Sequence, residues 1–147
     1  QAEIMLFFEV LEIHGAEFAF RTVEEVFRFV GYYMAILGPG ADSFVGALDA
    51  QVLQKLLPRL NGSRSKLEPI LWSMSALCAM QRQWDDGKIA NRNDIVQKAK
   101  NAASRGDENL HPANWKANGE YLSLSCEKIE RMQRLLEQNG FASFAEA

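Results

Sequence analysis

The chain has 147 residues, of which 48% are hydrophobic and 24% charged, and its formal net charge is −3. This length suits one domain with a full core, and the acidic balance excludes a global attraction to nucleic acid or anionic lipid. Neither a run of roughly 20 apolar residues that could span a bilayer nor the basic start of a secretory signal is present in the sequence.

The two cysteines, Cys78 and Cys126, are far apart and lack CxxC spacing. A disulfide between them is compatible with the sequence, but their spacing favours two buried free thiols in a reducing cytoplasm. The chain also starts without Met, in sequence typical of the middle of a helix. We therefore expect a cytoplasmic protein and a chain that is a fragment of something larger or a processed product.

The first two predicted helices follow from hydrophobic spacing. Residues 2–14 carry an apolar stripe with a period of about 3.6 residues, and Gly15 would end that helix. Residues 22–37 are dense in apolar side chains and predict a well-buried helix, ended by the Gly-Pro-Gly turn at 38–40.

A third and a fourth helix are predicted in the middle of the chain. Residues 44–60 form an amphipathic segment, which Pro58 should bend or end. A turn is expected at 61–63, and its serine is suited to start the next helix. That helix should cover 67–83, with Pro69 tolerated in its first turn.

The composition changes after residue 83 to a stretch rich in Asn, Asp, Lys and Gly with few apolar anchors. A short polar helix is expected at 93–103, and the rest is typical of a loop. We expect residues 84–120 to form a polar insertion that could be mobile.

The last segment predicts a helix over 126–139, with Ser125 as its N-cap and Gly140 as its C′ residue. Only residues 121–124 show a weak β-alternation. The sequence therefore predicts an all-α fold, a compact bundle of five to six helices forming a single domain over residues 1–147.

Motifs for catalysis or metal binding are not found. His14 and His111 have no HxxxH, HExxH or Cys/His spacing near them, so no metal site is predicted. The adjacent acids Glu24 and Glu25 would diverge on a helix. A Ser/His/Asp or Cys/His triad stays open, because its members need not be neighbours in sequence. A phosphate loop ending in Lys-Ser/Thr is absent, so the chain alone should not hydrolyse a nucleotide.

Basic residues at two helix starts are the candidate site residues. Arg21 could reach a phosphate bound elsewhere, or it could be an ordinary capping or ion-paired cation. Arg59, Arg64 and Lys66 surround a turn before a helix, where free amides and the helix dipole could help them hold a phosphate or a partner. They could equally be a solvated helix junction.

Three ordered blocks carry a family resemblance. The first includes Phe18-Ala19-Phe20-Arg21-Thr22 and ends at Val30. The second begins Leu48-Asp49-Ala50-Gln51, continues through Lys55-Leu56-Leu57-Pro58-Arg59, and ends Gly62-Ser63-Arg64. The third contains Leu124-Ser125-Cys126-Glu127-Lys128, with Arg131-Met132 and Asn139-Gly140-Phe141 behind it.

These blocks resemble the C-terminal helical lid of McrB-like AAA+ ATPases, the nucleotide-hydrolysing subunits of a modified-cytosine restriction system. That family commonly has Phe-Gly-Tyr-Arg in the first block and Leu-Ser-Tyr-x-Lys-x-x-Arg-Met in the third. Three positions depart from it, since Ala19 replaces a glycine, Asn61 an expected histidine and Cys126 an aromatic residue.

The resemblance implies a lid whose αβα core, with its phosphate loop, would lie before Gln1. That core would hold ATP or GTP with Mg. Arg21 would be the sensor 2 arginine, which contacts the γ-phosphate and stabilises the charge that develops during hydrolysis. The implied partners are the chain's own AAA+ core domain, neighbouring subunits of a ring and a nuclease subunit, with DNA reached indirectly.

Two other functions stay open. The chain could be a non-enzymatic helical module that binds a protein partner through the hydrophobic face of the first helix or the basic cluster at 59–66. Direct DNA binding by that cluster is weaker, because the whole chain is acidic.

Overall fold

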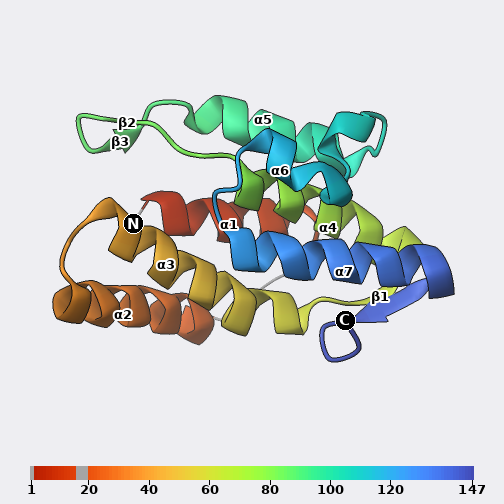
Figure 1. Cartoon of the computed structure of the whole chain (residues 1–147), viewed down its shortest axis with the longest axis horizontal. Helices are drawn as coiled ribbons and strands as arrows, with labels where there is room; N and C mark the ends of the chain where they lie inside the picture. Colours follow the sequence, from red (N-terminus) through yellow and green to blue (C-terminus); the bar gives the residue numbers. More distant parts are fainter. Residues whose placement is uncertain (1, 16–19) are drawn as a thin grey trace.

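The computed structural model describes residues 2–15 and 20–147 (Figure 1). The fold is all-α as predicted, although these residues form seven α-helices rather than five to six. The helices are α1 (Ala2–Ile13), α2 (Phe20–Leu37), α3 (Ala41–Gln51), α4 (Arg64–Ala79), α5 (Arg92–Ala103), α6 (Trp115–Asn118) and α7 (Ser123–Asn139). Two short antiparallel pairs join β1 (Asn61–Ser63) to β4 (Phe141–Ser143) and β2 (Trp84–Asp85) to β3 (Lys88–Ile89).

Helix α4 is the centre of the bundle. Residues 70–79 are buried without interruption, as expected for a helix that is covered on every side. Helices α5, α7 and α1 pack against it, and α2 and α3 form an antiparallel pair at the edge of the molecule (Figure 1). One hydrophobic cluster joins side chains from α1 through α7, among them Phe7, Leu71 and Ile129.

Helix α2 is less buried than its composition predicted. Only Thr22, Val26 and Val30 are buried, whereas Phe20 and Ile36 are 76% and 81% exposed. The expectation of a well-buried helix was wrong, because the described structure places a neighbour on one side of α2 and leaves its outer side in contact with solvent.

The stretch at 84–120 is more regular than expected. Helix α5 lies along α4 and buries Ile95, Val96, Ala99 and Ala102. After it come two 3₁₀ turns (Glu108–Leu110 and Pro112–Asn114) and α6, whose Trp115 is buried. A few well-spaced apolar residues are therefore enough to attach this polar stretch to the core.

The segment before α4 bends where Pro58 predicted. Helix α3 widens into a π-helical turn (Val52–Leu56), which is followed by a 3₁₀ turn (Leu57–Arg59). Pro58 has no amide hydrogen and cannot continue the helical ladder. Helix α4 then starts at Arg64, earlier than expected, so Pro69 lies in its second turn rather than its first.

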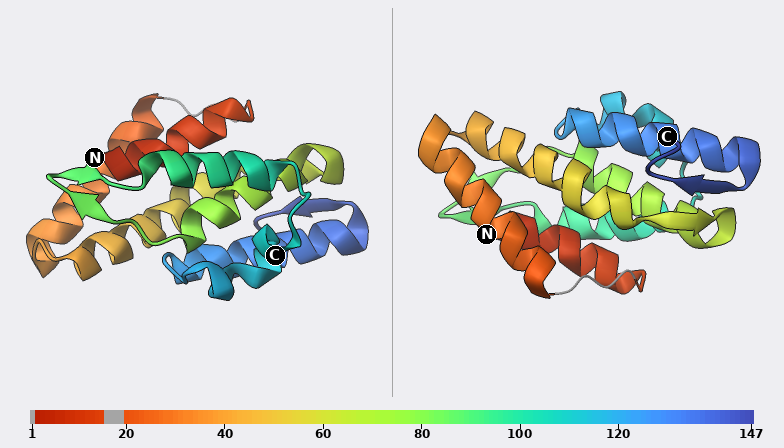
Figure 2. Two further views of the ribbon diagram at one scale, coloured as in Figure 1. Left: turned by 90° about the horizontal axis from the view of Figure 1, so that it is seen from above. Right: turned by 90° about the horizontal axis from the view of Figure 1, so that it is seen from below.

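The predicted C-terminal helix starts earlier than expected. Helix α7 begins at Ser123 with Leu122 as its N-cap, so Ser125 is not the N-cap and the β-alternation at 121–124 was misleading. Gly140 follows α7 with φ +74°, the left-handed geometry predicted for it. The chain then forms β4, which pairs with β1 at the end of the bundle, beside the C-terminal end of α7 (Figure 2).

Candidate functional site

Arg21 lies in the first turn of α2 with its side chain 88% exposed. Its Nε is 3.2 Å from Oε1 of Glu25, one helical turn later, and the other oxygen of Glu25 is 3.4 Å from Nζ of Lys55. The hydrogen bond and charge of Lys55, with a smaller effect of Arg21, hold the pKa of Glu25 below its usual value. The structure therefore makes Arg21 an accessible, ion-paired cation. Phe18 and Ala19 of the same block lie outside the described residues.

Two of the basic residues near Gly62 point in different directions. Arg64 pairs with Glu68 of its own helix at 2.8 Å, whereas Lys66 is exposed. Residues two apart on a helix do not face each other, so these two side chains diverge. Arg59 is exposed and makes an interaction of its own. The amide of Arg64 is also occupied, because it donates to the carbonyl of Gly140.

Glu68 is the centre of a polar network between helices. Its side chain is 8% exposed and accepts from Arg64, from Arg105 at 3.1 Å and from the Gln133 amide at 3.0 Å. Burial opposes ionisation, but the hydrogen bonds from Gln133 and the two arginines outweigh it, so the pKa of Glu68 lies below its usual value. Gln133 also donates to Glu137, which contacts His111 at 2.8 Å.

Asp49 of α3 forms the second interhelical polar contact. Its carboxylate accepts hydrogen bonds from the amides of Leu124 and Ser125 at 3.0 and 2.9 Å. The Ser125 hydroxyl is 2.6 Å from the same carboxylate. Asp49 thus caps α7 from another helix. A carboxylate is favourable there because the amides of the first helical turn have no partner within the helix.

A buried ion pair is the feature that the sequence did not indicate. Glu3 of α1 and Arg82 have fully buried side chains, and Nε of Arg82 is 3.2 Å from the Glu3 carboxylate. The guanidinium donates to the Met80 carbonyl and stacks 4.9 Å from the centre of the Tyr121 ring. Burial raises the pKa of Glu3, although Arg82 and Tyr121 oppose the shift. Because the two partners are distant in sequence, no motif could have revealed them.

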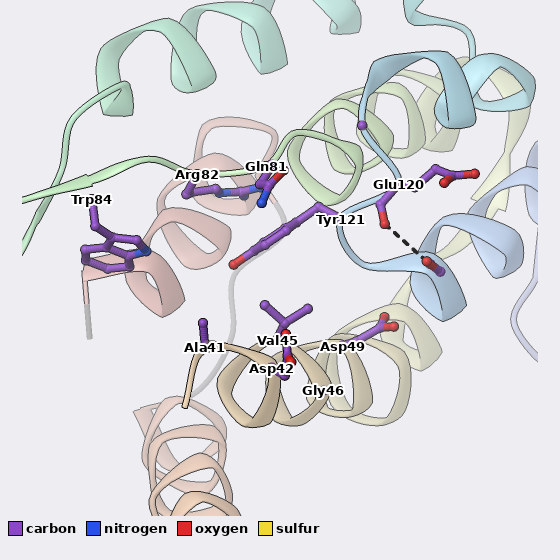
Figure 3. A pocket seen from close by; sticks show the side chains of 12 residues that line it. Ala41, Asp42, Val45, Gly46, Asp49, Gln81, Arg82, Trp84, Glu120 and Tyr121 are labelled. Carbon is purple, nitrogen blue, oxygen red and sulfur yellow. Dashed lines mark hydrogen bonds between the residues drawn. The ribbon is translucent and has the colours of Figure 1, made fainter. Parts of the chain in front are cut away.

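A cavity of about 510 Å³ opens beside this pair (Figure 3). Tyr121 projects into it between α3 and the segment carrying Gln81 and Arg82, and Trp84 stands on the opposite side. Gly119 closes part of the wall with φ +138°, where an added Cβ would lie 2.5 Å from the Ala79 carbonyl oxygen. The aromatic rings of Tyr121 and Trp84 and the side-chain amide of Gln81 are suited to contact a planar polar ligand.

Two polar residues at the edge of this cavity, Ser123 and Glu120, direct their polar groups elsewhere. The hydroxyl of Ser123 donates to the backbone carbonyl of Glu120, and the side chain of Glu120 points away from the cavity (Figure 3). Among residues 2–15 and 20–147, no group of three potential metal ligands comes together. Within the same ranges, no helix has the length and hydropathy needed to cross a membrane.

The sequence matches one known protein family. The model of the family described as "Domain of unknown function (DUF8727)" matches residues 1–141. The chain belongs to the DUF8727 family. The match includes all seven helices and ends at the first residue of β4, so the contacts described above lie within the DUF8727 domain. No curated protein and no solved structure matched the chain.

Proposed function

We propose that this DUF8727 chain is the C-terminal helical lid of a McrB-like AAA+ nucleotide-dependent motor that serves a DNA restriction or defence system. In this role Arg21 contributes the sensor 2 guanidinium to hydrolysis, and the lid takes part in ring assembly. The nucleotide, ATP or GTP with Mg, is held by the core domain. The chain works in the cytoplasm with that core, with neighbouring subunits and with a nuclease subunit, and it reaches DNA indirectly.

The observation that carries the proposal is that the three resembling blocks meet in space. Glu25 of the first block binds Lys55 of the second, and Asp49 of the second block binds Ser125 of the third. These residues are far apart in sequence, yet they join α2, α3 with the π-helical turn that continues it, and α7 into one unit. Mutual contact supports reading the blocks as one pattern rather than as three chance similarities.

The surroundings of Arg21 suit a residue that exchanges partners. An exposed ion pair is only weakly stabilising, whereas a guanidinium binds a phosphate through strong, charge-assisted hydrogen bonds. If Arg21 turned toward a phosphate, Glu25 would keep its contact with Lys55. The carboxylate would therefore not lose all of its partners.

The test is nucleotide hydrolysis by the full-length protein. We expect Arg21→Ala to lower the hydrolysis rate by roughly 100-fold, because one transition-state donor is lost. Arg134→Ala is a matched control, since Arg134 is also exposed and paired with a glutamate four residues away. Equal hydrolysis in the two variants would remove Arg21 from the mechanism.

The coding sequence before Gln1 provides a second test. A phosphate loop followed by an acidic strand would support the lid. A start codon immediately before Gln1 would contradict it and favour a free-standing helical module.

The structure favours a specific version of the interaction-module alternative. The hydrophobic face of α1 is buried, with Leu6, Phe7 and Leu11 inaccessible to solvent, so it is not available to a partner. Helix α2 instead exposes several large apolar side chains, among them Phe20, Ile36 and Leu37. Binding of a protein partner through α2 would be the expected activity under this alternative.

A further inference from the structure

The flank of α2 beside α1 carries a partly exposed apolar stripe, which we call the α2 seam. It consists of Phe20, Val23, Phe27, Gly31 and Met34. Their separations of three and four residues put all five on one face of the helix. Figure 2 shows α2 beside α1 at the outer edge of the molecule, and a groove of about 570 Å³ lies there. Its apolar lining comes from Met5 of α1 with Phe20, Val23 and Phe27 of the seam.

Gly31 is an open position in the middle of the seam. A Cβ added at this position would meet no described atom within 4 Å, so packing inside the chain does not require a glycine. Glycine in the middle of a helix costs about 0.5–1 kcal/mol relative to alanine. A glycine on an exposed helical face allows close approach of a second backbone or of a large side chain.

The charges of Glu24 and Arg28 indicate which partner the seam would bind. Glu24 and Arg28 line the same groove, one helical turn apart, and neither makes a hydrogen bond or an ion pair with another described residue. If two copies of α2 pack antiparallel about an axis near Phe27, Glu24 of each copy lies about 3 Å along the helix axis from Arg28 of the other, within reach of these long side chains. The same arrangement sets Val23 opposite Gly31 and Phe20 opposite Met34. A parallel arrangement would instead place like charges together.

We propose that the α2 seam is the interface of a two-fold symmetric homodimer with antiparallel α2 helices. The seam is self-complementary in shape, charge and polarity, which is the requirement of an isologous contact. This dimer does not depend on the proposed role of Arg21, and it differs from a ring contact, which joins unlike surfaces. An 18-residue helix is about 27 Å long. One such helix pair is at the small end of specific interfaces, so we expect a dissociation constant in the micromolar range.

The first experiment measures the mass of the 147-residue chain by sedimentation and light scattering over a range of concentrations. A monomer–dimer equilibrium is expected. Phe27→Asp should abolish the dimer, because it places a charge on the axis. Leu124→Asp is the control, since Leu124 is 55% exposed on α7 and lies outside the seam. A monomer at every concentration, or assembly into a species other than a dimer, would overturn the proposal.

The second experiment uses charge reversal, which does not disturb the core. Glu24→Arg and Arg28→Glu should each weaken self-association at least tenfold, because each variant brings like charges together. An equimolar mixture of the two variants should form a heterodimer, since each then supplies the charge that the other needs. Recovery on mixing would show that residues 24 and 28 of the two copies meet across the interface, and the weakening of each variant alone tests the antiparallel direction. Variants that self-associate like the unchanged chain, or a mixture that stays monomeric, would rule the register out.

Discussion

Asp49 and Ser125 lie 76 residues apart in the chain and form a buried contact between α3 and α7. The Ser125 hydroxyl lies within hydrogen-bond distance of both the carboxylate and the backbone carbonyl of Asp49, at 2.6 and 3.1 Å. Asp49 therefore does for α7 what a local N-cap residue usually does, and it attaches that helix to its neighbour at the same time.

Asp49→Ala should lower the free energy of unfolding by about 2–4 kcal/mol, because two amides and a hydroxyl at the start of α7 lose their acceptor. Urea denaturation followed by circular dichroism would measure the loss. Asp42→Ala is a suitable control, since Asp42 is an exposed acid in the first turn of the same α3. Equal stability of the two variants would show that the Asp49 cap contributes little.

Removing one member of the buried ion pair should be among the most damaging polar substitutions. Arg82→Met leaves the Glu3 carboxylate buried without its partner and should cost about 3–5 kcal/mol. The double variant Glu3→Gln with Arg82→Met should lose less than the sum of the single variants, because it contains no unpaired charge. Arg92→Met is the control, because Arg92 and Glu9 form a pair with both side chains 42% exposed. Strict additivity in the cycle would contradict the coupling.

The same pair gives a prediction with a definite sign in pH. Burial raises the pKa of Glu3 in the folded chain. A raised pKa means that the folded state binds the proton more tightly, so the contribution to stability is largest below pH 4.5 and is lost as the pH rises. Without Arg82 this effect should grow. The stability deficit of Arg82→Met should therefore be smaller at pH 4 than at pH 7, and a deficit that does not change with pH would exclude this explanation.

Glu68 should have the opposite pH dependence. Its pKa is lowered in the folded chain, so its contribution to stability is present above pH 4.5 and is lost as the pH falls through its folded pKa. Glu68→Gln should reduce stability by about 1–3 kcal/mol at pH 7, since hydrogen bonds to a charged group are lost. The difference from the unchanged chain should shrink on acidification. Denaturation at pH 3 to 7 measures it, with the exposed Glu127→Gln variant as the baseline.

The two cysteines should be unreactive while the chain is folded. Both are free and buried, and desolvation raises the pKa of Cys126 to about 12 and that of Cys78 well above its usual value. Since the thiolate is the reactive form, Ellman's reagent at pH 8 should modify neither thiol until urea unfolds the chain. Immediate modification in native buffer would show that one of them is accessible.

Local spacing was sufficient to predict most of the helices. The apolar stripe before Gly15, the bend at Pro58 and the left-handed Gly140 are all present, because each depends on a few neighbouring residues. The burial of α2 was predicted wrongly. Its many apolar residues indicate a helix, but spacing does not tell how many of its faces have a neighbour.

The candidate site residues also divide into features that the sequence determines and features that depend on the tertiary structure. The sequence by itself determined an acidic all-α chain with a basic residue at the start of α2, since composition and periodicity are properties of the chain alone. Only the tertiary structure decided that Arg21 is exposed beside Glu25, that Arg64 is held by Glu68, and that Glu3 meets Arg82. The partners in the last pair come from opposite halves of the chain. Their energies depend on burial and distance, which exist only once the helices have packed.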